Sequence, residues 1–251
     1  MRMFVLAAAA VLALTGVAAA QTRLGSEGAY PPYNFIDEAG NLAGFDIDVG
    51  NEICERAGLE CVWVVNEWDT IIPNLLAGNY DAILAGMSDT EERRKTITFS
   101  QTYFPPDPSA YVALAGKTFD FANLSGQRIG AQGATIQAAH LEATYKDTNT
   151  LLTYETPDQA LADLNAGNID LILADKSYLQ EAVAGSSGTL ALTGDEVEIG
   201  GGVAAGLRQA DTELQAKFDA ALTAMKADGA LDAMISAYFP EREGGPFFLP
   251  E

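Results

Sequence analysis

Positive charge is scarce in this sequence. Of its 251 residues, 14 are lysine or arginine and 35 are aspartate or glutamate, which gives a formal net charge of −21 at pH 7. A nucleic-acid backbone or an anionic lipid surface would repel such a chain, so we expect neither as a partner. The 48% of hydrophobic and 20% of charged residues are ordinary for a globular protein, which argues against a disordered, collagenous or multi-span membrane chain.

Cysteine and histidine are scarce as well, with two residues and one residue respectively. Cys54 and Cys61 flank a segment that contains Gly58, where a helix would end and lead into a strand. Their spacing is not that of zinc ligands, and His140 is far away in the sequence, so we expect no metal site. In an oxidising compartment we expect the two cysteines to form a disulfide.

Long apolar runs are limited to the first twenty residues. There, Arg2 precedes an apolar run from Phe4 to Leu14, and small residues follow at 16–20. This pattern is typical of a secretory signal with an Ala-x-Ala cleavage site after Ala20, and the run is shorter than the ~20 apolar residues that a membrane span needs. We therefore expect residues 1–20 to be removed and the mature chain to be soluble outside the cytoplasm.

The rest of the chain alternates between strand-like and helix-like patterns, which predicts an α/β protein with a mostly parallel sheet. Its length allows one large domain or two of about 120 residues each. Amphipathic patterns predict two further helices near the C-terminus, and the Gly- and Pro-rich tail 240–251 is expected on the surface without regular structure. The predicted elements are strands at 22–25 and 61–65 and helices at 46–57, 69–76, 211–226 and 230–238.

An internal repeat is visible at an offset of 89 residues, where 75–88 is echoed by 164–177. Each copy predicts a helix end, an Ala-Gly-Asn turn and a buried strand that runs into a polar loop. The repeat indicates two lobes of similar build, although generic helix-to-strand turns could also match by chance. Ligands of open α/β sheets lie at the carboxyl ends of strands, which here are Gly86 to Ser88 and Asp175. We expect the chain to cross between the lobes at 109–114 and 202–207.

Two loops could bind an anion. Residues 88–91 fit a capping box with Ser88 as the helix cap, and Arg93 one turn later carries a planar donor that matches a carboxylate. Arg93 could equally be an exposed residue of a basic cluster. In the second lobe, a strand at 127–131 leads into the tight loop 132–135, where Thr135 is expected to cap a helix through His140.

Several short motifs occur in a fixed order along the chain. They are Gly44-Phe45-Asp46-Ile47-Asp48, Trp68-Asp69, Met87-Ser88-x-Thr90-x-x-Arg93, Ile129-Gly130-Ala131-Gln132 and Gly206-Leu207-Arg208. Together they resemble the family-3 extracellular solute-binding proteins, the polar amino-acid receptors of bacterial ABC importers, and the resemblance covers residues 21–239. Glu27, three residues before Tyr30, and the cysteine spacing are most similar to lysine/arginine/ornithine, histidine and opine receptors.

This resemblance implies a two-lobed periplasmic-binding-protein fold of type II. Each lobe would be a mixed, mostly parallel sheet flanked by helices, and two hinge strands would join the lobes. Lobe 1 would comprise 21–110 and 204–251, and lobe 2 would comprise 111–203. A monomer in the periplasm would bind an L-amino acid as the lobes close and deliver it to an ABC permease in the inner membrane, without a cofactor.

The resemblance also implies roles for single residues. Arg93 would bind the ligand α-carboxylate with the backbone N–H groups of Ser88 and Thr135. Asp175 would bind the α-ammonium group with the Ser88 hydroxyl and the Gly86 carbonyl. Tyr30 and Trp68 would enclose the ligand side chain, Glu27 would meet its distal positive charge, and Gln132 completes the expected set. Without the resemblance, Tyr30 and Trp68 would be packing residues and Glu27 a turn carboxylate.

The ligand set leaves alternatives open. Arginine, lysine, ornithine, histidine, an opine or a glutamine-type ligand would suit aromatic walls and one carboxylate, and some hydroxyls that relatives carry are absent at 85–88 and 134–136. An enzyme similar to cyclohexadienyl dehydratases could use Glu27 as a general acid or base. We expect a binding protein, since no nucleophile and base are paired in the sequence.

Overall fold

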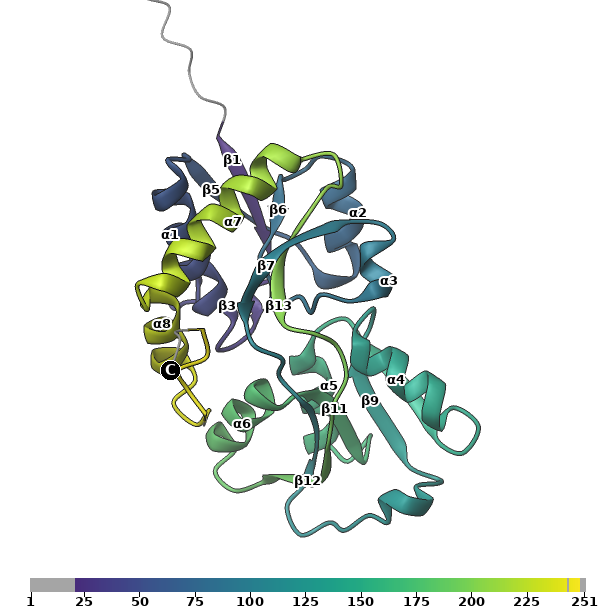
Figure 1. The fold of residues 1–251 in the computed structure, drawn as a ribbon. Coiled ribbons are helices and arrows are strands. Elements are labelled where there is room, and N and C mark those ends of the chain that lie inside the picture. The colour runs from purple at the N-terminus through teal and green to yellow at the C-terminus, as the bar shows by residue number, and fades with distance from the viewer. Residues whose placement is uncertain (1–20, 243, 249–251) are drawn as a thin grey trace, which may run out of the picture.

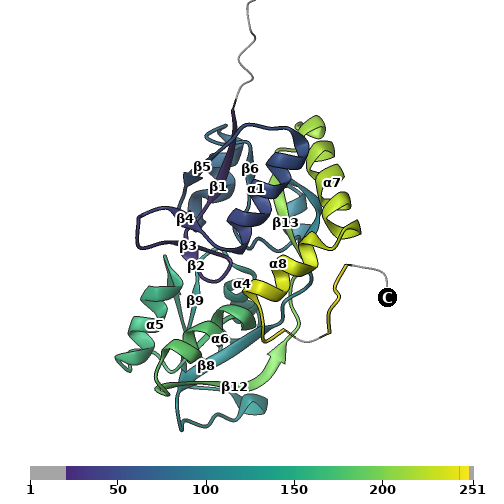
Figure 2. The same cartoon turned by 90° about the vertical axis from the view of Figure 1, so that its left-hand side faces the viewer.

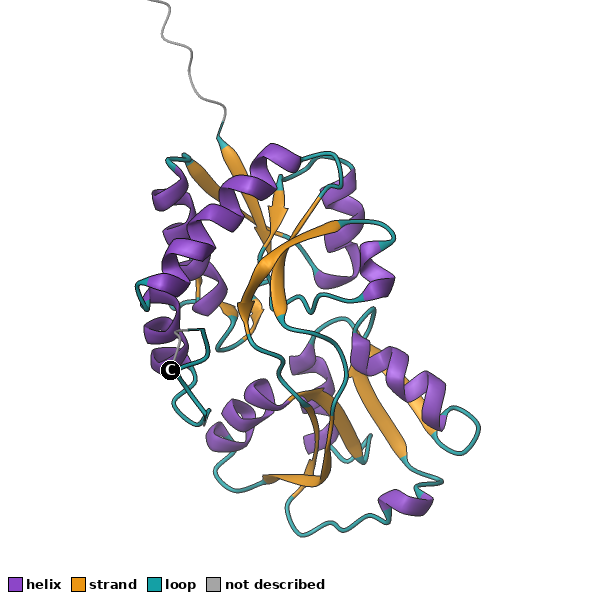
Figure 3. Ribbon diagram, in the orientation of Figure 1, coloured by secondary structure: helices purple, strands orange, loops and turns teal. Residues whose placement is uncertain are grey.

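Residues 21–242 and 244–248 are described in the computed structural model of the chain, and they form two lobes, each built on its own five-stranded sheet (Figure 1). The predicted signal segment, residues 1–20, lies outside the described residues. Figure 3 shows that helices flank the sheet of each lobe. Within the described part of the chain, no helix is both long and apolar enough to cross a membrane.

The first lobe contains a mixed sheet with the strand order β5-β1-β6-β13-β7. β1 pairs in parallel with β5 and β6, and β13 is antiparallel to β6 and β7. The buried strands are apolar on both faces: Ala204 packs with α2 on one side, while Val203 and Ala205 pack with α1, α7 and α8 on the other. The elements are β1 (Thr22–Ser26), β5 (Cys61–Val65), β6 (Ala82–Ile83), β7 (Thr98–Phe104), β13 (Val203–Leu207), α1 (Phe45–Ala57), α2 (Ile71–Leu76), α7 (Thr212–Ala227) and α8 (Ala230–Tyr238).

The second lobe contains a mixed sheet with the strand order β10-β9-β11-β8-β12. β9 pairs in parallel with β10 and β11, whereas β8 is antiparallel to β11 and β12. Helices α5 and α6 pack on one face and α4 on the other. The elements are β8 (Ser109–Leu114), β9 (Arg128–Gln132), β10 (Thr150–Tyr154), β11 (Leu171–Asp175), β12 (Leu190–Val197), α4 (Ile136–Tyr145), α5 (Pro157–Asn165) and α6 (Lys176–Gly185).

Short elements complete the fold. A small three-stranded sheet follows β1, and single turns of helix precede α2, β7 and β9. These elements are β2 (Ala29–Tyr30), β3 (Asn34–Ile36), β4 (Leu42–Ala43), η1 (Trp68–Thr70), α3 (Glu91–Arg94) and η2 (Phe121–Asn123).

The sequence repeat is a structural repeat. Gly78 and Gly167, with φ of 79° and 74°, turn the chain after α2 and α5 in a conformation that favours glycine. The aspartate that follows each turn accepts from the backbone N–H of an arginine on the neighbouring strand, at 2.9 Å both for Arg23 to Asp81 and for Arg128 to Asp170. The two sheets also have the same arrangement of parallel and antiparallel strands, so the prediction of two lobes of similar build is confirmed.

The expected crossings at 109–114 and 202–207 are wrong by a few residues. β8 pairs with strands of the second lobe and β13 with strands of the first, so the chain crosses at 105–108 and 198–202. The reason lies in backbone hydrogen bonding, because each apolar segment pairs with strands of one sheet along its whole length. The links between the lobes are irregular instead, and three prolines at 105–108 and three glycines at 200–202 favour this.

The disulfide between Cys54 and Cys61 is present, as predicted. It joins the last turn of α1 to the first residue of β5 across Gly58, whose φ of 63° ends the helix in the left-handed conformation. The link is therefore a local staple within the first lobe, and the loop that it closes is short.

The described residues of the C-terminal tail, 240–242 and 244–248, form no helix or strand, as expected, but hydrogen bonds fasten them to the protein beside α8 (Figure 2). Arg242 donates from Nη1 to Oδ1 of Asp107 at 2.8 Å and from Nη2 to the Pro106 carbonyl at 2.5 Å. The other oxygen of Asp107 accepts from the Tyr33 hydroxyl at 3.1 Å and from the Ser177 N–H at 3.2 Å. The Asp107 carboxylate, on a segment that links the lobes, therefore hydrogen-bonds to the tail, to the first lobe and to α6 of the second lobe.

We predict that Arg242→Ala destabilises the protein by about 3 kcal/mol, because Asp107 would keep a charge that is only 5% exposed and lose its cation. Urea unfolding monitored by circular dichroism measures this loss. Arg56→Ala is the control: it breaks pairs with Glu52 and Asp228, whose side chains are 28% and 51% exposed, and should cost about 1 kcal/mol or less. Equal losses in the two variants would show that the tail is not fastened by this pair.

Candidate functional site

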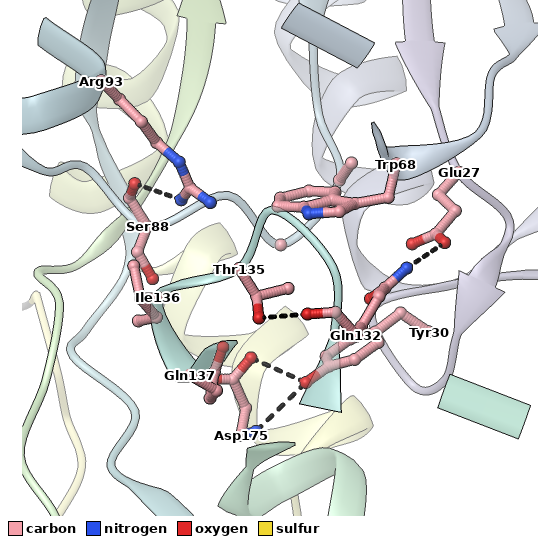
Figure 4. A pocket seen from close by; sticks show the side chains of 12 residues that line it. Glu27, Tyr30, Trp68, Ser88, Arg93, Gln132, Thr135, Ile136, Gln137 and Asp175 are labelled. Atoms are coloured by element: carbon pink, nitrogen blue, oxygen red, sulfur yellow. Dashed lines mark hydrogen bonds between the residues drawn. The ribbon is translucent and has the colours of Figure 1, made fainter. Parts of the chain in front are cut away.

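A pocket of about 350 Å³ lies between the two lobes. Each of the nine residues predicted to bind a ligand lines it, together with three that were not predicted, Ala85, Ile136 and Gln137 (Figure 4). The nine are Glu27, Tyr30, Trp68, Gly86, Ser88, Arg93, Gln132, Thr135 and Asp175.

The pocket lies where strands end. In the first lobe Glu27 follows β1, while Gly86 and Ser88 follow β6. In the second lobe Gln132 is the last residue of β9 and Asp175 the last of β11. Parallel strands of one sheet bring their carboxyl ends to one edge, so each lobe presents its polar loops to the other.

The positively charged side of the pocket is centred on Arg93. Its guanidinium group lies 5.2 Å from the centre of the Trp68 ring and donates from Nη1 to the Ser88 carbonyl at 2.9 Å. Removal from water lowers its pKa to about 10, and Asp175 opposes this shift through space. Among the described residues no carboxylate forms an ion pair with Arg93, so the remaining N–H donors of this half-buried side chain are available to an anion.

The expected capping box at Ser88 is wrong. The cap of α3 is Thr90, whose hydroxyl accepts from the Arg93 N–H at 3.2 Å. Ser88 is held extended by an antiparallel bridge to Val203, so the helix begins only after that bridge. In the second lobe the prediction is confirmed: Thr135 caps α4 and accepts from the Ala138 N–H at 3.1 Å, although α4 continues past His140 to Tyr145.

A carboxylate, Asp175, lies on the side of the pocket formed by the second lobe. Its Oδ2 accepts from the Tyr30 hydroxyl at 2.8 Å, across the gap between the lobes, and its Oδ1 accepts from Gln137 Nε2 at 2.8 Å. Loss of water around the carboxylate and the nearby charge of Asp107 raise its pKa to about 7. Asp175 therefore gains stabilisation from any cation that enters the pocket.

A second carboxylate, Glu27, is 8% exposed at the far end of the pocket from Arg93 (Figure 4). Burial raises its pKa to about 7, and the charges of Asp69 and Asp158 act in the same direction. Gln132 Nε2 donates to Glu27 Oε1 at 2.6 Å, which is a further hydrogen bond between the lobes at this site. Gln132 was predicted to contact a ligand, and its contact in the structure is with this carboxylate.

The aromatic walls are Trp68 and Tyr30, which lie on either side of the space between Arg93 and Glu27 (Figure 4). Tyr30 stacks on Tyr178, with ring centres 4.4 Å apart and planes 13° from parallel. Sequence reasoning missed Tyr178 and Gln137. Their signal was spacing: Tyr178 lies one helical turn after Asp175, and Gln137 lies two residues after the Thr135 cap.

The chemistry of the pocket is that of binding. It offers one guanidinium group, two carboxylates and two aromatic faces. No group of three or more histidine, cysteine, aspartate or glutamate side chains that could hold a metal ion occurs within 21–242 and 244–248.

Known proteins are similar to this chain in sequence and in fold. The chain is 33% identical over 231 residues to the lysine/arginine/ornithine-binding periplasmic protein of Escherichia coli K12, covering 86% of each chain. It is 34% identical over 245 residues to the L-arginine-binding protein of Pseudomonas aeruginosa, covering 92% of this chain and 93% of that one.

A crystal structure of a periplasmic His/Glu/Gln/Arg/opine family-binding protein from Silicibacter pomeroyi, in complex with lysine, matches with a TM-score of 0.83 and 50% identity. The match covers 90% of this chain and 100% of the other, and it confirms the predicted two-lobed α/β fold. These relatives are binding proteins, which agrees with the expectation that the chain is not an enzyme. The model of the bacterial extracellular solute-binding proteins, family 3, matches residues 22–241, and the chain belongs to that family.

Proposed function

We propose that this protein is a periplasmic receptor that binds a basic L-amino acid between its lobes and delivers it to an ABC permease in the inner membrane. The observation that carries the proposal is the charge of the pocket, whose charged side chains are Glu27, Asp175 and Arg93. A basic amino acid carries two cations and one carboxylate, so it compensates each of the three. A neutral amino acid would leave one carboxylate desolvated without a partner.

The positions of the three groups suggest the orientation of the ligand. Its α-carboxylate would bind Arg93 and the backbone N–H groups of Ser88 and Thr135, because a planar guanidinium group binds a carboxylate with two parallel hydrogen bonds. Its α-ammonium group would bind Asp175, with the Ser88 hydroxyl and the Gly86 carbonyl as further acceptors. The side chain would then extend between Trp68 and Tyr30 toward Glu27.

The aromatic walls fit such a side chain. Aliphatic carbons gain apolar contact with both rings, and a guanidinium or ammonium group gains cation–π attraction. Tyr178 supports the outer face of Tyr30, which fixes the plane of that ring.

The hydrogen bonds between the lobes suggest how binding is linked to closure. Tyr30 of the first lobe reaches Asp175 of the second, and Gln132 of the second reaches Glu27 of the first. A ligand that binds both carboxylates would stabilise this closed arrangement, since it contacts groups from both lobes at once. The relatives named for lysine, arginine and ornithine support the choice of a basic ligand, and the predicted signal supports export.

We predict that arginine, lysine or ornithine raises the thermal stability of the mature chain most among the amino acids. A ligand at 100 times its Kd should stabilise the fold by about 2.7 kcal/mol. A thermal-shift screen followed by calorimetry measures the ranking. Octopine and glutamine belong in the screen, and a neutral or acidic amino acid at the top of the ranking would contradict the proposal.

We predict that Glu27→Gln weakens binding of a basic ligand by roughly five- to tenfold relative to glutamine, because a charge-assisted hydrogen bond exceeds a neutral one by about 1 kcal/mol or more. Calorimetry with both ligands gives the ratio. Asp158→Asn is the control: it removes a nearby negative charge that does not line the pocket, and should leave the ratio within about twofold of wild type. Equal weakening of both ligands by Glu27→Gln would exclude Glu27 as the selecting carboxylate.

We predict that binding of a basic ligand releases protons below pH 7. Both carboxylates have a raised pKa of about 7 in the empty protein, so they are largely protonated at pH 6, and a cationic ligand favours their ionised forms. The observed affinity should therefore rise as the pH increases through 7 and level off above it. Calorimetry at pH 6 in two buffers of different ionisation enthalpy counts the protons, and Glu27→Gln should lower the count; identical heats in both buffers would refute the linkage.

A further inference from the structure

The hydroxyl group of Tyr30 has no part in enclosing a ligand side chain, because only the face of the ring is needed for that. Phenylalanine at this position would give a similar wall, so the hydroxyl needs an account of its own. Tyr30 lies at the end of β2 in the first lobe, yet its ring packs against the buried apolar clusters of both lobes. The ring therefore crosses the gap, and its hydroxyl reaches the second lobe (Figure 4).

Two hydrogen bonds join this hydroxyl to a single residue of the second lobe. The O–H group donates to Oδ2 of Asp175 at 2.8 Å, and the oxygen accepts from the Asp175 backbone N–H at 3.1 Å. A tyrosine hydroxyl has a single proton to donate, so its donor is fully used here. Asp175 ends β11 and directly precedes α6, so Tyr30 is fastened to a regular part of the second lobe.

The ring of Tyr30 also stacks on Tyr178, which belongs to α6 of the second lobe. The Tyr178 hydroxyl is buried and has no hydrogen-bond partner among the described residues. Two tyrosines from opposite lobes are thus in contact, and they differ in what their hydroxyls do. The hydroxyl of Tyr30 is bonded across the gap, and that of Tyr178 is not, which makes the pair a comparison built into the protein.

The contacts of the Tyr30 hydroxyl require closed lobes. Glu27, Trp68 and Gln132 are each 8% exposed or less, so an amino acid can enter or leave the pocket only when the lobes move apart. Tyr30 moves with one lobe and Asp175 with the other, so this separation breaks both hydrogen bonds. Both bonds join protein groups alone, so they stabilise the closed arrangement with or without an amino acid in the pocket.

We propose that the Tyr30 hydroxyl is a latch that holds the lobes closed and thereby sets how long a ligand stays bound. The part that concerns the ligand rests on the proposed function. The ligand's α-ammonium group need not displace the latch, because a carboxylate has about four acceptor positions and Asp175 receives one hydrogen bond from Tyr30 and one from Gln137. The latch and the ligand can therefore hold the same carboxylate together.

The first test measures how fast lysine leaves Tyr30→Phe, by a rapid-filtration chase of radiolabelled lysine with excess unlabelled lysine. The variant keeps the ring and loses two hydrogen bonds, one of them to a carboxylate, so its dissociation rate constant should rise about tenfold or more. The association rate constant should not fall, because lysine enters the open form, in which the latch is already broken.

Tyr178→Phe is the matched control. It removes the hydroxyl of the other ring in the stacked pair, which has no partner among the described residues. Both rate constants should therefore stay within about twofold of wild type. Circular dichroism during heating checks that both variants are folded before the rates are compared.

The second test measures closure without any ligand, by small-angle X-ray scattering of the mature chain in the absence of amino acids. We expect Tyr30→Phe to have a larger radius of gyration than wild type, because it loses contacts that exist only in the closed arrangement. Tyr178→Phe should have the wild-type radius of gyration. This measurement separates a latch from a hydroxyl that merely orients Asp175 toward the ligand, since orientation alone would not change the shape of the free protein.

Each combination of results decides the inference. Faster dissociation from Tyr30→Phe together with a larger radius of gyration supports it. A dissociation rate constant within about twofold of wild type overturns it, and so does faster dissociation with an unchanged radius of gyration. A wild type that binds no basic amino acid overturns the proposed function, and the scattering comparison then decides the latch by itself.

Discussion

The pocket holds more negative than positive charge in a space with little water, and much of the structure follows from that imbalance. Glu27 and Asp175 face Arg93, and the charges of Asp69, Asp107 and Asp158 add to the negative potential around them. Each carboxylate is held by neutral donors from the opposite lobe or its own, which orient it without neutralising it. Such an arrangement would suit a cationic partner, and the two hydrogen bonds that reach the carboxylates from the opposite lobe satisfy them in part.

The two lobes are built in the same way. In each lobe, an arginine on one strand donates to the aspartate that precedes the neighbouring parallel strand. A glycine with positive φ lies between that aspartate and the helix before it. This arrangement sets the register of parallel strands, and hence the place where the strands end. Because the ends of two such sheets face one another, loops of different sequence can line one pocket while the framework beneath them repeats.

Sequence reasoning reached the features that depend on local patterns. The alternation of apolar runs gave the class of fold, the repeat gave the two lobes, and Thr135 was identified as a cap because a cap acts within its own helix. The predictions that were wrong depended on partners distant in the sequence. Ser88 does not cap α3 because it pairs with Val203. The links between the lobes lie a few residues from their predicted positions because β8 and β13 each pair within one sheet. The contact of Arg242 with Asp107 was missed for the same reason, since nothing near either residue in the sequence indicates that they pair.

The position of Trp68 gives the molecule an internal optical probe. The chain has two tryptophans. Trp68 lies in the pocket beneath the Arg93 guanidinium group, whereas Trp63 lies on β5, packs against the backbone of Gly50 and donates to Asn51 at 2.9 Å. Indole emission responds to nearby charge, so an anion that neutralises Arg93 changes the electric field at Trp68 and leaves Trp63 in its old surroundings. Replacing Trp63 by phenylalanine would leave a single fluorophore at the pocket, a built-in reporter of occupancy that needs no attached dye.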